Sequence, residues 1–283
     1  MRLAAIAKNS QHFNLSFTMK KLLFWAIMGI AVLAVSCKRD AGSEQTSRKV
    51  SVNTVQLEKT SGKDCDQPDS LRIACLAIRL SRPVVTEGSD ALKNAVESWG
   101  TAYLAGILSP ELSAQEASAA DVEATVQTFI DGHNQFLAEN EGALMGYWTA
   151  ESDATTVLND GKHLTLQING FVFSGGAHGS PTAAVATFDA ATGQQLGWND
   201  LVTDQAAVQA LAEKKFRVEQ AEAFNDGFAF DDTFPFVLPA NFGLTDKGIY
   251  FYYVAYEVAP YAMGATAFEI PFSELGDLYK LKK

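Results

Sequence analysis

The first candidate for chemistry is a glycine-rich segment with one histidine, Gly175-Gly176-Ala177-His178-Gly179, which lies between two strand-like runs. Glycines reach positive φ without a steric penalty, so the segment predicts a tight loop that exposes an imidazole. Such an imidazole can act as a general base, bind a ligand or hydrogen-bond the backbone of its own turn. For catalysis it would need a carboxylate partner such as Asp189 or Glu257. Because no Gly-x-Ser-x-Gly or His-Glu-x-x-His pattern accompanies it, the sequence favours a structural or binding role and assigns no catalytic residue.

The second candidate is the loop-like segment from Tyr256 to Gly264, which follows the aromatic run Tyr250–Tyr253. Aromatic side chains beside a proline and a glycine are typical of recognition surfaces, because they supply contact area at a low cost in conformational entropy. They are also typical of a bend that covers a core, and the sequence leaves both interpretations open. The candidate ligand-binding residues are Gly176, His178, Tyr256, Glu257 and Tyr261.

The other histidines and one acidic pair do not form a recognisable metal motif. His133 lies at helical spacing among apolar residues, which favours a hydrogen-bonded core position. His163 opens a strand beside a turn, where we expect it to be exposed. Asp231 and Asp232 could hold a cation, but no calcium-loop spacing surrounds them, so solvated loop charge is the favoured interpretation. The sequence therefore predicts neither a metal nor another cofactor.

The N-terminus has the order of a bacterial export signal. Lys20 and Lys21 precede an unbroken apolar run of 14 residues, Leu22–Val35, and this order of a basic and a short apolar region is that of a signal peptide. A spanning helix needs roughly 20 apolar residues, so the run is short for a membrane span. Met19 is a better start than Met1, and residues 1–18 add nothing that a signal requires.

The end of this signal contains a cysteine. The stretch Leu33–Cys37 resembles a bacterial lipobox, which implies diacylglycerol on the Cys37 thiol and cleavage before it. Residues 1–36 are then a lipoprotein signal peptide. An ordinary signal peptide cleaved near Ser36 and an uncleaved N-terminal anchor are the alternatives. In all three cases the rest of the chain lies outside the cytoplasm, and the lipoprotein interpretation places it in the cell envelope, held to the membrane through Cys37.

The two remaining cysteines, Cys65 and Cys75, are ten residues apart. In an oxidising compartment two such cysteines most simply form a disulfide. Closing so short a loop would stabilise the fold by roughly 2–3 kcal/mol on the chain-entropy estimate. Zinc binding is disfavoured because neither a histidine nor a second cysteine pair lies nearby at ligand spacing.

The charge balance is acidic. The chain has 33 acidic and 22 basic residues, a net charge of −11. Such a surface argues against nucleic-acid binding and against electrostatic adhesion to anionic lipid, and it suits a cationic partner or simply solubility. Residues 37–62 are polar and have no strong period, so they are expected to be a flexible tether between lipid and fold.

Beyond the tether the pattern predicts α+β: an antiparallel sheet with helices packed on one face, in two subdomains that form one module. Ser89 can cap the first helix, and 159–162 reads as a hairpin turn. The expected strands are 71–81, 145–158, 163–173, 181–188, 242–245, 249–256 and 266–270. The expected helices are 90–104, 120–137, 204–224 and 271–275.

Four strings in this order resemble the RsiV-type extracytoplasmic domain of unknown function: Gly175–Gly179, Phe188-Asp189, Trp198–Leu201 and Phe251–Gly264. The resemblance covers residues 116–283. Residues 63–115 resemble the companion domain that precedes it in RsiV-type and PdaC-type proteins. The resemblance implies an extracytoplasmic α+β module without catalytic activity of its own, and in RsiV this region binds lysozyme, a basic protein.

Three functions compete at this point. The first is a lipid-anchored binding protein of the envelope that recognises a cationic protein such as lysozyme or a cell-wall glycan, peptidoglycan. The second is an envelope hydrolase that uses His178 with a nearby carboxylate. The third is a structural envelope protein without a small ligand. The resemblance does not extend to the cytoplasmic sigma-binding segment of RsiV or to the deacetylase domain of PdaC, so neither sigma-factor signalling nor deacetylation is expected.

Overall fold

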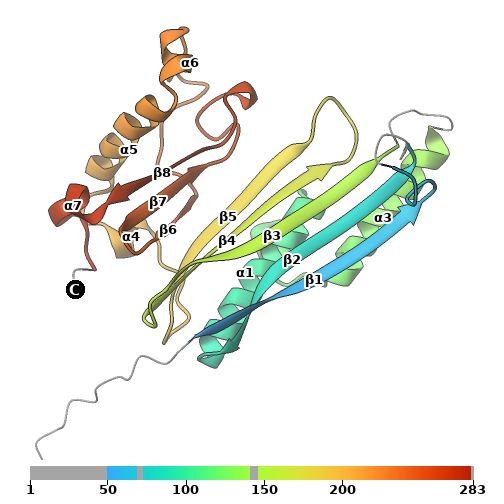
Figure 1. Cartoon of the computed structure of the whole chain (residues 1–283), viewed down its shortest axis with the longest axis horizontal. Helices are drawn as coiled ribbons and strands as arrows, with labels where there is room; N and C mark the ends of the chain where they lie inside the picture. The colour runs from blue at the N-terminus through green and yellow to red at the C-terminus, as the bar shows by residue number, and fades with distance from the viewer. Residues whose placement is uncertain (1–49, 69–72, 141–145, 282–283) are drawn as a thin grey trace, which may run out of the picture. The chain divides into compact units, whose positions relative to one another are not determined.

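The computed structural model describes residues 50–68, 73–140 and 146–281. These residues form a five-stranded and a three-stranded sheet (Figure 1), together with helices, which confirms the α+β prediction. The strands of the first sheet, in spatial order, are β1 (Ser51–Gly62), β2 (Cys75–Glu87), β3 (Trp148–Asn159), β4 (His163–Phe173) and β5 (Ser180–Asp189). The second sheet consists of β6 (Asn241–Leu244), β7 (Gly248–Tyr253) and β8 (Thr266–Pro271). All neighbours are antiparallel except β2 and β3, which run parallel.

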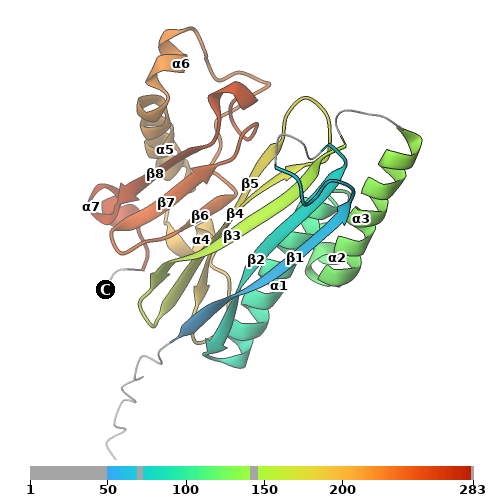
Figure 2. The same cartoon turned by 45° about the vertical axis from the view of Figure 1, so that its right-hand side comes forward.

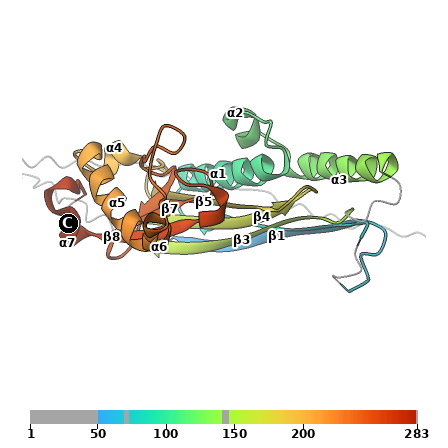
Figure 3. The ribbon, with the colours of Figure 1, turned by 90° about the horizontal axis from the view of Figure 1, so that it is seen from above.

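Helices α1 and α3 lie on one face of the five-stranded sheet (Figure 3). The helices are α1 (Asp90–Leu108), α2 (Ala114–Ser118), α3 (Val122–Glu139), α4 (Trp198–Leu201), α5 (Gln205–Glu219), α6 (Ala221–Asn225) and α7 (Phe272–Leu275). Two single 3-10 turns are η2 (Tyr261–Met263) and η3 (Gly276–Leu278). A long parallel crossover from β2 to β3 contains the first three helices, which explains how they come to cover that face.

Helix α1 begins where its sequence predicts. The Ser89 hydroxyl accepts a hydrogen bond from the Leu92 amide at 3.2 Å, which satisfies one of the free N–H groups of the first turn. Leu92, Val96 and Leu104 recur on one face of the helix and are buried against the sheet.

The hairpin between β3 and β4 also follows local chemistry. The Asp160 carboxylate accepts hydrogen bonds from the amides of Lys162 and His163, and Gly161 takes a φ of 81°. An aspartate that accepts hydrogen bonds from the amides two and three residues further on, together with a glycine at positive φ, closes a tight turn without strain. Strand β4 therefore has the bounds that the sequence predicts.

The second sheet packs on β4 and β5 through a glycine. A β-carbon at Gly243 of β6 would lie 2.6 Å from Thr165 Cγ2 and 3.0 Å from Val185 Cγ1. The Thr187 hydroxyl is 2.8 Å from that of Thr165 and accepts a hydrogen bond from the Leu244 amide at 2.9 Å. Close backbone approach, which only glycine permits, thus joins the two sheets.

Strand β1 corrects the expected tether of residues 37–62. Residues 51–62 form a strand that pairs along its whole length with β2. The sequence does not reveal it because the strand lies at the sheet edge, where most of its side chains are exposed and apolar alternation is weak.

Strand β2 continues through Pro83 to Glu87, beyond the end expected at residue 81. Its pairing with β3 stops at Arg79, so Pro83 lies where the strand has a neighbour on one side only. A proline is tolerated there because it interrupts no second ladder. The expected subdomain boundary between 115 and 116 falls inside α2, and β2 and β3, from its two sides, pair in one sheet.

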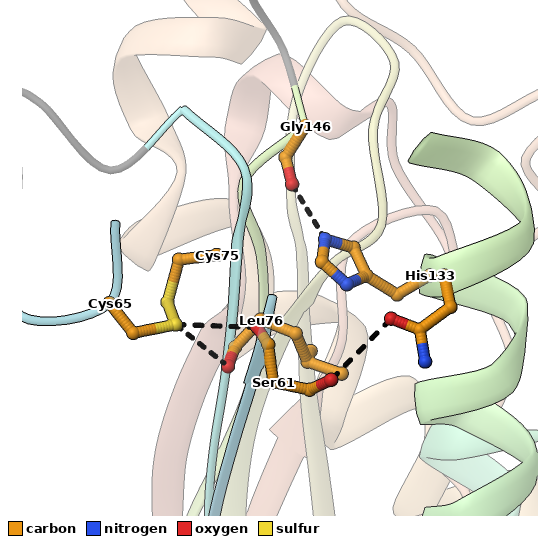
Figure 4. The surroundings of a disulfide bond; sticks show 7 residues. Ser61, Cys65, Cys75, Leu76, His133 and Gly146 are labelled. Carbon is orange, nitrogen blue, oxygen red and sulfur yellow. Dashed lines mark hydrogen bonds between the residues drawn. A yellow bond between two sulfur atoms is a disulfide. The ribbon is translucent and has the colours of Figure 1, made fainter. Parts of the chain in front are cut away.

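The predicted disulfide is confirmed. Cys65 and Cys75 are bonded at the start of β2, close to Ser61 at the end of β1 (Figure 4). The predicted signal peptide of residues 1–36 and the lipidation site Cys37 lie outside the described residues. Within the described ranges no helix is long and apolar enough to cross a membrane.

Candidate functional site

Two loops that are far apart in the sequence meet at the candidate residues. The ring of His178, from the loop between β4 and β5, stacks on the ring of Tyr261, from the connection between β7 and β8, with centroids 4.0 Å apart and planes at 22°. The Tyr261 hydroxyl donates a hydrogen bond to the Gly179 carbonyl at 2.9 Å. His178 Nδ1 is 3.1 Å from the same carbonyl. We call His178, Tyr256 and Tyr261 the aromatic site.

Tyr256 extends this stack toward solvent. Its ring centroid is 5.6 Å from that of Tyr261, and 57% of the residue is exposed. Its φ is +72°, a conformation that is unfavourable by roughly 1–2 kcal/mol per residue for a side chain with a β-carbon. A hydrogen bond from its amide to the Ala259 carbonyl at 3.0 Å holds the bend. A strained residue with an exposed ring is a recognised mark of a functional surface.

Glu257 holds this bend in place. One carboxylate oxygen accepts a hydrogen bond from the Val254 amide at 3.0 Å, and the other accepts one from the Ala240 amide at 2.8 Å. Charge-assisted hydrogen bonds of this kind are about twice as strong as neutral ones. Glu257 therefore acts as a positioning residue for Tyr256 and Tyr261.

The glycine loop adopts the shape that its composition predicts. Gly175 and Gly176 have φ of 95° and 92°, and Gly176 faces open space. A β-carbon at Gly179 would overlap the ring of Phe171. Sequence reasoning did not single out Phe171, which is 39% exposed on β4. The signal for it was its place two residues before the end of a strand that leads into the loop.

In the described residues no hydrogen bond or ion pair joins His178 to either carboxylate considered as a catalytic partner. Each oxygen of Glu257 instead accepts a backbone hydrogen bond. Asp189 ends β5, which starts two residues after His178, so about 30 Å of extended strand separates the two residues. The Asp189 carboxylate accepts hydrogen bonds from Ala191 N, Thr192 N and the Thr192 hydroxyl, all within 3.0 Å.

The Asp189 carboxylate is set by this turn. Partial burial raises its pKa, but the hydrogen bonds from Thr192 and Ala191, with a smaller contribution from His163, outweigh the burial and leave the pKa below its ordinary value. A carboxylate stabilised in its charged form in this way is suited to closing a turn rather than to accepting a proton.

His133 is a core residue, as its helical position predicts. It is fully buried on α3, and its Nε2 is 2.7 Å from the Gly146 carbonyl (Figure 4). His163 is only partly exposed, which corrects the expectation, because its Nδ1 lies 3.4 Å from Asp160 in the hairpin turn. Asp231 accepts hydrogen bonds from the amides of Thr233 and Phe234, so it folds its loop. No group of three or more metal-ligating side chains occurs in the described part of the chain.

The comparisons with known proteins agree with the fold and name no activity. The family model described as "Protein of unknown function (DUF3298)" matches residues 199–273, inside the region 116–283. The match includes Tyr256, Glu257 and Tyr261. Strand β5 and the loop before it, which contains His178, lie outside the match. The expected companion domain over 63–115 stays a prediction.

Two crystal structures of DUF3298 family proteins resemble this chain. The one from Bacteroides fragilis has a TM-score of 0.61 and 19% identity, and the alignment covers 83% of this chain and 95% of that chain. The one from Pseudomonas aeruginosa has a TM-score of 0.56 and 21% identity, with 82% and 95% coverage. At these identities the likeness shows the fold alone. No curated protein matches this chain.

Proposed function

We propose that this chain is a lipid-anchored binding protein of the bacterial cell envelope whose ligand contacts the aromatic site. The observation that carries the proposal is the stack of His178 on Tyr261, which joins two loops and supports the exposed ring of Tyr256. Rigid aromatic rings lose little conformational entropy on binding, which makes them effective contact residues.

A binding role fits the site better than hydrolysis. Neither carboxylate considered as a partner of His178 is hydrogen-bonded to it: Asp189 accepts from its own turn, and Glu257 accepts from the amides of Val254 and Ala240. A histidine that is oriented by a carboxylate in catalysis lies within hydrogen-bond reach of it. The acidic balance of the chain suits a cationic protein such as lysozyme, and the stacked rings also suit a sugar ring of peptidoglycan.

The test is retention of the detergent-solubilised full chain on immobilised lysozyme and, separately, on purified peptidoglycan. Retention on either matrix that falls at least about tenfold in Tyr256→Ala would support the proposal, since one hot-spot aromatic contributes on the order of 2 kcal/mol. The matched control is Val218→Ala, which removes an exposed apolar side chain of α5. Equal retention of both variants, or release of soluble fragments from peptidoglycan by the wild type, would contradict a binding role for this site.

The anchor is tested separately. Mass spectrometry of the protein purified from bacterial membranes should find a mature N-terminus at Cys37 that carries diacylglycerol. Cys37→Ser should release the protein from the membrane fraction. A mature chain that begins elsewhere without lipid would contradict the anchor and leave the binding proposal to its own test.

A further inference from the structure

Strand β1 forms one edge of the five-stranded sheet, at the opposite side from β5 (Figures 1 and 2). It is 12 residues long and pairs with β2 on one side. In the parts of the chain that the structure describes, no strand pairs with its outer side. An open edge of this length is a template for another strand, and natural proteins usually cover or interrupt such edges.

A cavity of about 330 Å³ opens beside this edge. Five consecutive residues of β1, from Val55 to Lys59, border it, so both the backbone and the side chains of the edge form one wall. The rest of the lining mixes apolar and charged side chains: Leu80, Leu104 and Val122 together with Arg82 and Glu123. Val55 is 49% exposed, although it is an apolar β-branched residue. Strand addition combines this kind of open backbone edge with pockets for alternate side chains.

The register with β2 assigns the two faces of β1. Leu57 lies opposite Leu80, which belongs to the core beneath α1 and α3. From Val55 to Ser61, odd-numbered residues of β1 therefore face the helices and even-numbered residues face away, whereas Val52, nearer the start of the strand, also packs on the core beneath α1. When two copies pair as antiparallel edges of one continuous sheet, residues directly opposite each other must lie on the same face. The two-fold axis of a symmetric pair must therefore pass through a residue position, so that odd-numbered residues of one copy lie opposite odd-numbered residues of the other.

One such register is self-complementary. With Gln56 opposite Gln56 of a second copy, Val55 lies opposite Leu57 of that copy, and the same contact occurs twice. Thr54 then faces Glu58 of the second copy, and Asn53 faces Lys59. Apolar side chains oppose apolar ones and like charges do not meet. A centre at Leu57 would instead place Val55 against Lys59, and a centre at Glu58 would oppose two carboxylates.

The helices leave room for this arrangement. Helix α3 approaches β1 at Lys59, where Glu123 forms a 3.7 Å ion pair with it. In the register centred on Gln56 the two copies of Lys59 are six residues apart, about 20 Å along the strands. From Glu123 beside Lys59, α3 runs to Asn134, whose Oδ1 is 3.5 Å from the Ser61 hydroxyl, so the helix extends away from Gln56 and the two copies of α3 do not collide.

We infer that the partner of this edge is a second copy of the same chain, paired antiparallel through β1 with Gln56 on the two-fold axis. The Val55 side chain of each copy closes the mouth of the other copy's cavity against Leu57. The two five-stranded sheets become one ten-stranded sheet, and the contact is isologous, as in most homodimers.

Cysteine cross-linking of the detergent-solubilised full chain tests the register, with copper-phenanthroline and oxygen as the oxidant. Gln56→Cys should give a covalent dimer, because the two β-carbons face each other across the axis. Thr54→Cys and Glu58→Cys alone should cross-link at least about tenfold more slowly, since each is about 13 Å from its own copy and disulfides need α-carbons within about 7 Å. A mixture of these two variants should cross-link. The unsubstituted chain controls for Cys37.

Analytical ultracentrifugation tests the interface itself. The wild type should sediment as a dimer, Val55→Lys as a monomer, and Thr155→Lys, an exposed change on β3, as a dimer. Circular dichroism confirms that the variants are folded. A wild-type monomer at every soluble concentration, a Val55→Lys dimer, or equal cross-linking at positions 54, 56 and 58 would each overturn the inference.

Discussion

The two carboxylates considered as partners of His178 accept hydrogen bonds from backbone amides. Glu257 accepts hydrogen bonds from two amides and fixes the bend that carries Tyr256. Asp189 does the same for the turn after β5. A carboxylate that accepts hydrogen bonds from several backbone N–H groups satisfies those groups outside a helix or a sheet, so the backbone there can take an irregular conformation. This is why a strained, exposed tyrosine can be held in one conformation.

Glu257→Ala should therefore weaken both stability and binding. Two amides would lose a charged acceptor, which destabilises the fold by about 1–3 kcal/mol. Urea unfolding measures this loss, and retention on the matrix that binds wild type measures the second effect. Glu257→Gln, which keeps one acceptor oxygen, should lie between wild type and Glu257→Ala. An alanine variant as stable as wild type would show that the amides find other acceptors.

The lowered pKa of Asp189 predicts how the stability of the fold depends on acid pH. Its pKa is lowered in the folded protein, so its ionised form stabilises the fold above the ordinary pKa of 3.8. This contribution is lost as pH falls below that value through the folded pKa. Between about pH 6 and about pH 2, the urea midpoint should fall less steeply with pH in Asp189→Asn than in wild type. Asp153→Asn, an exposed change on β3, is the control, and identical slopes for wild type and Asp189→Asn would refute the assignment.

At the scale of elements, the position of the aromatic site depends on how the two sheets pack. The His178 loop leaves the first sheet, and the Tyr256–Tyr261 segment leaves the second. Gly243 lets β6 approach β4 and β5, and the Val185 amide donates to the Asn241 side chain at 3.1 Å. The contact between the loops is thus a consequence of sheet packing.

Two glycine substitutions separate packing from backbone propensity. Gly243→Ala should destabilise the protein by about 1–3 kcal/mol, because the new methyl group overpacks against Thr165 and Val185. Gly106→Ala, in α1 with nothing within 4 Å of the new β-carbon, should stabilise it by about 0.5–1 kcal/mol. Thermal and urea unfolding measure both. Effects of equal sign would mean that the contact of the two sheets is not close at Gly243.

At the scale of the whole molecule, the disulfide secures the connection between β1 and β2. Because β1 is an edge strand, it is held mainly by its backbone hydrogen bonds with β2, and few side-chain contacts add to them. The bond between Cys65 and Cys75 limits how far the two strands can separate in the unfolded chain.

Replacing both cysteines by serine should lower the free energy of unfolding by about 2–3 kcal/mol. Urea unfolding of the double variant, and of wild type with and without reductant, measures the change. Reductant should have no effect on the double variant. Hydrogen exchange should rise first in β1, since an edge strand opens more easily than a central one. Unchanged stability would mean that the unfolded chain already holds the two cysteines close.

Local patterns predicted much of the fold. The N-cap of α1, the hairpin at residue 160 and the bounds of β4 depend on side chains within a few residues of one another, so the sequence contains their cause. The pairing of Cys65 with Cys75 was likewise predictable, because only two cysteines remain after Cys37. Strand β1 was not predictable in this way, since its polar, exposed side chains carry no period and its pairing partner lies beyond residue 74.

The sequence by itself determined which residues compose the candidate site: a glycine loop gives His178 an exposed position, and a proline–glycine segment presents Tyr256 to solvent and contains Tyr261, which is half-buried. Only the tertiary structure decided that these two loops touch and that Asp189 and Glu257 accept hydrogen bonds from backbone amides rather than from His178. The reason is that local chemistry sets a loop's shape, whereas contacts between residues 82 positions apart depend on how two sheets pack.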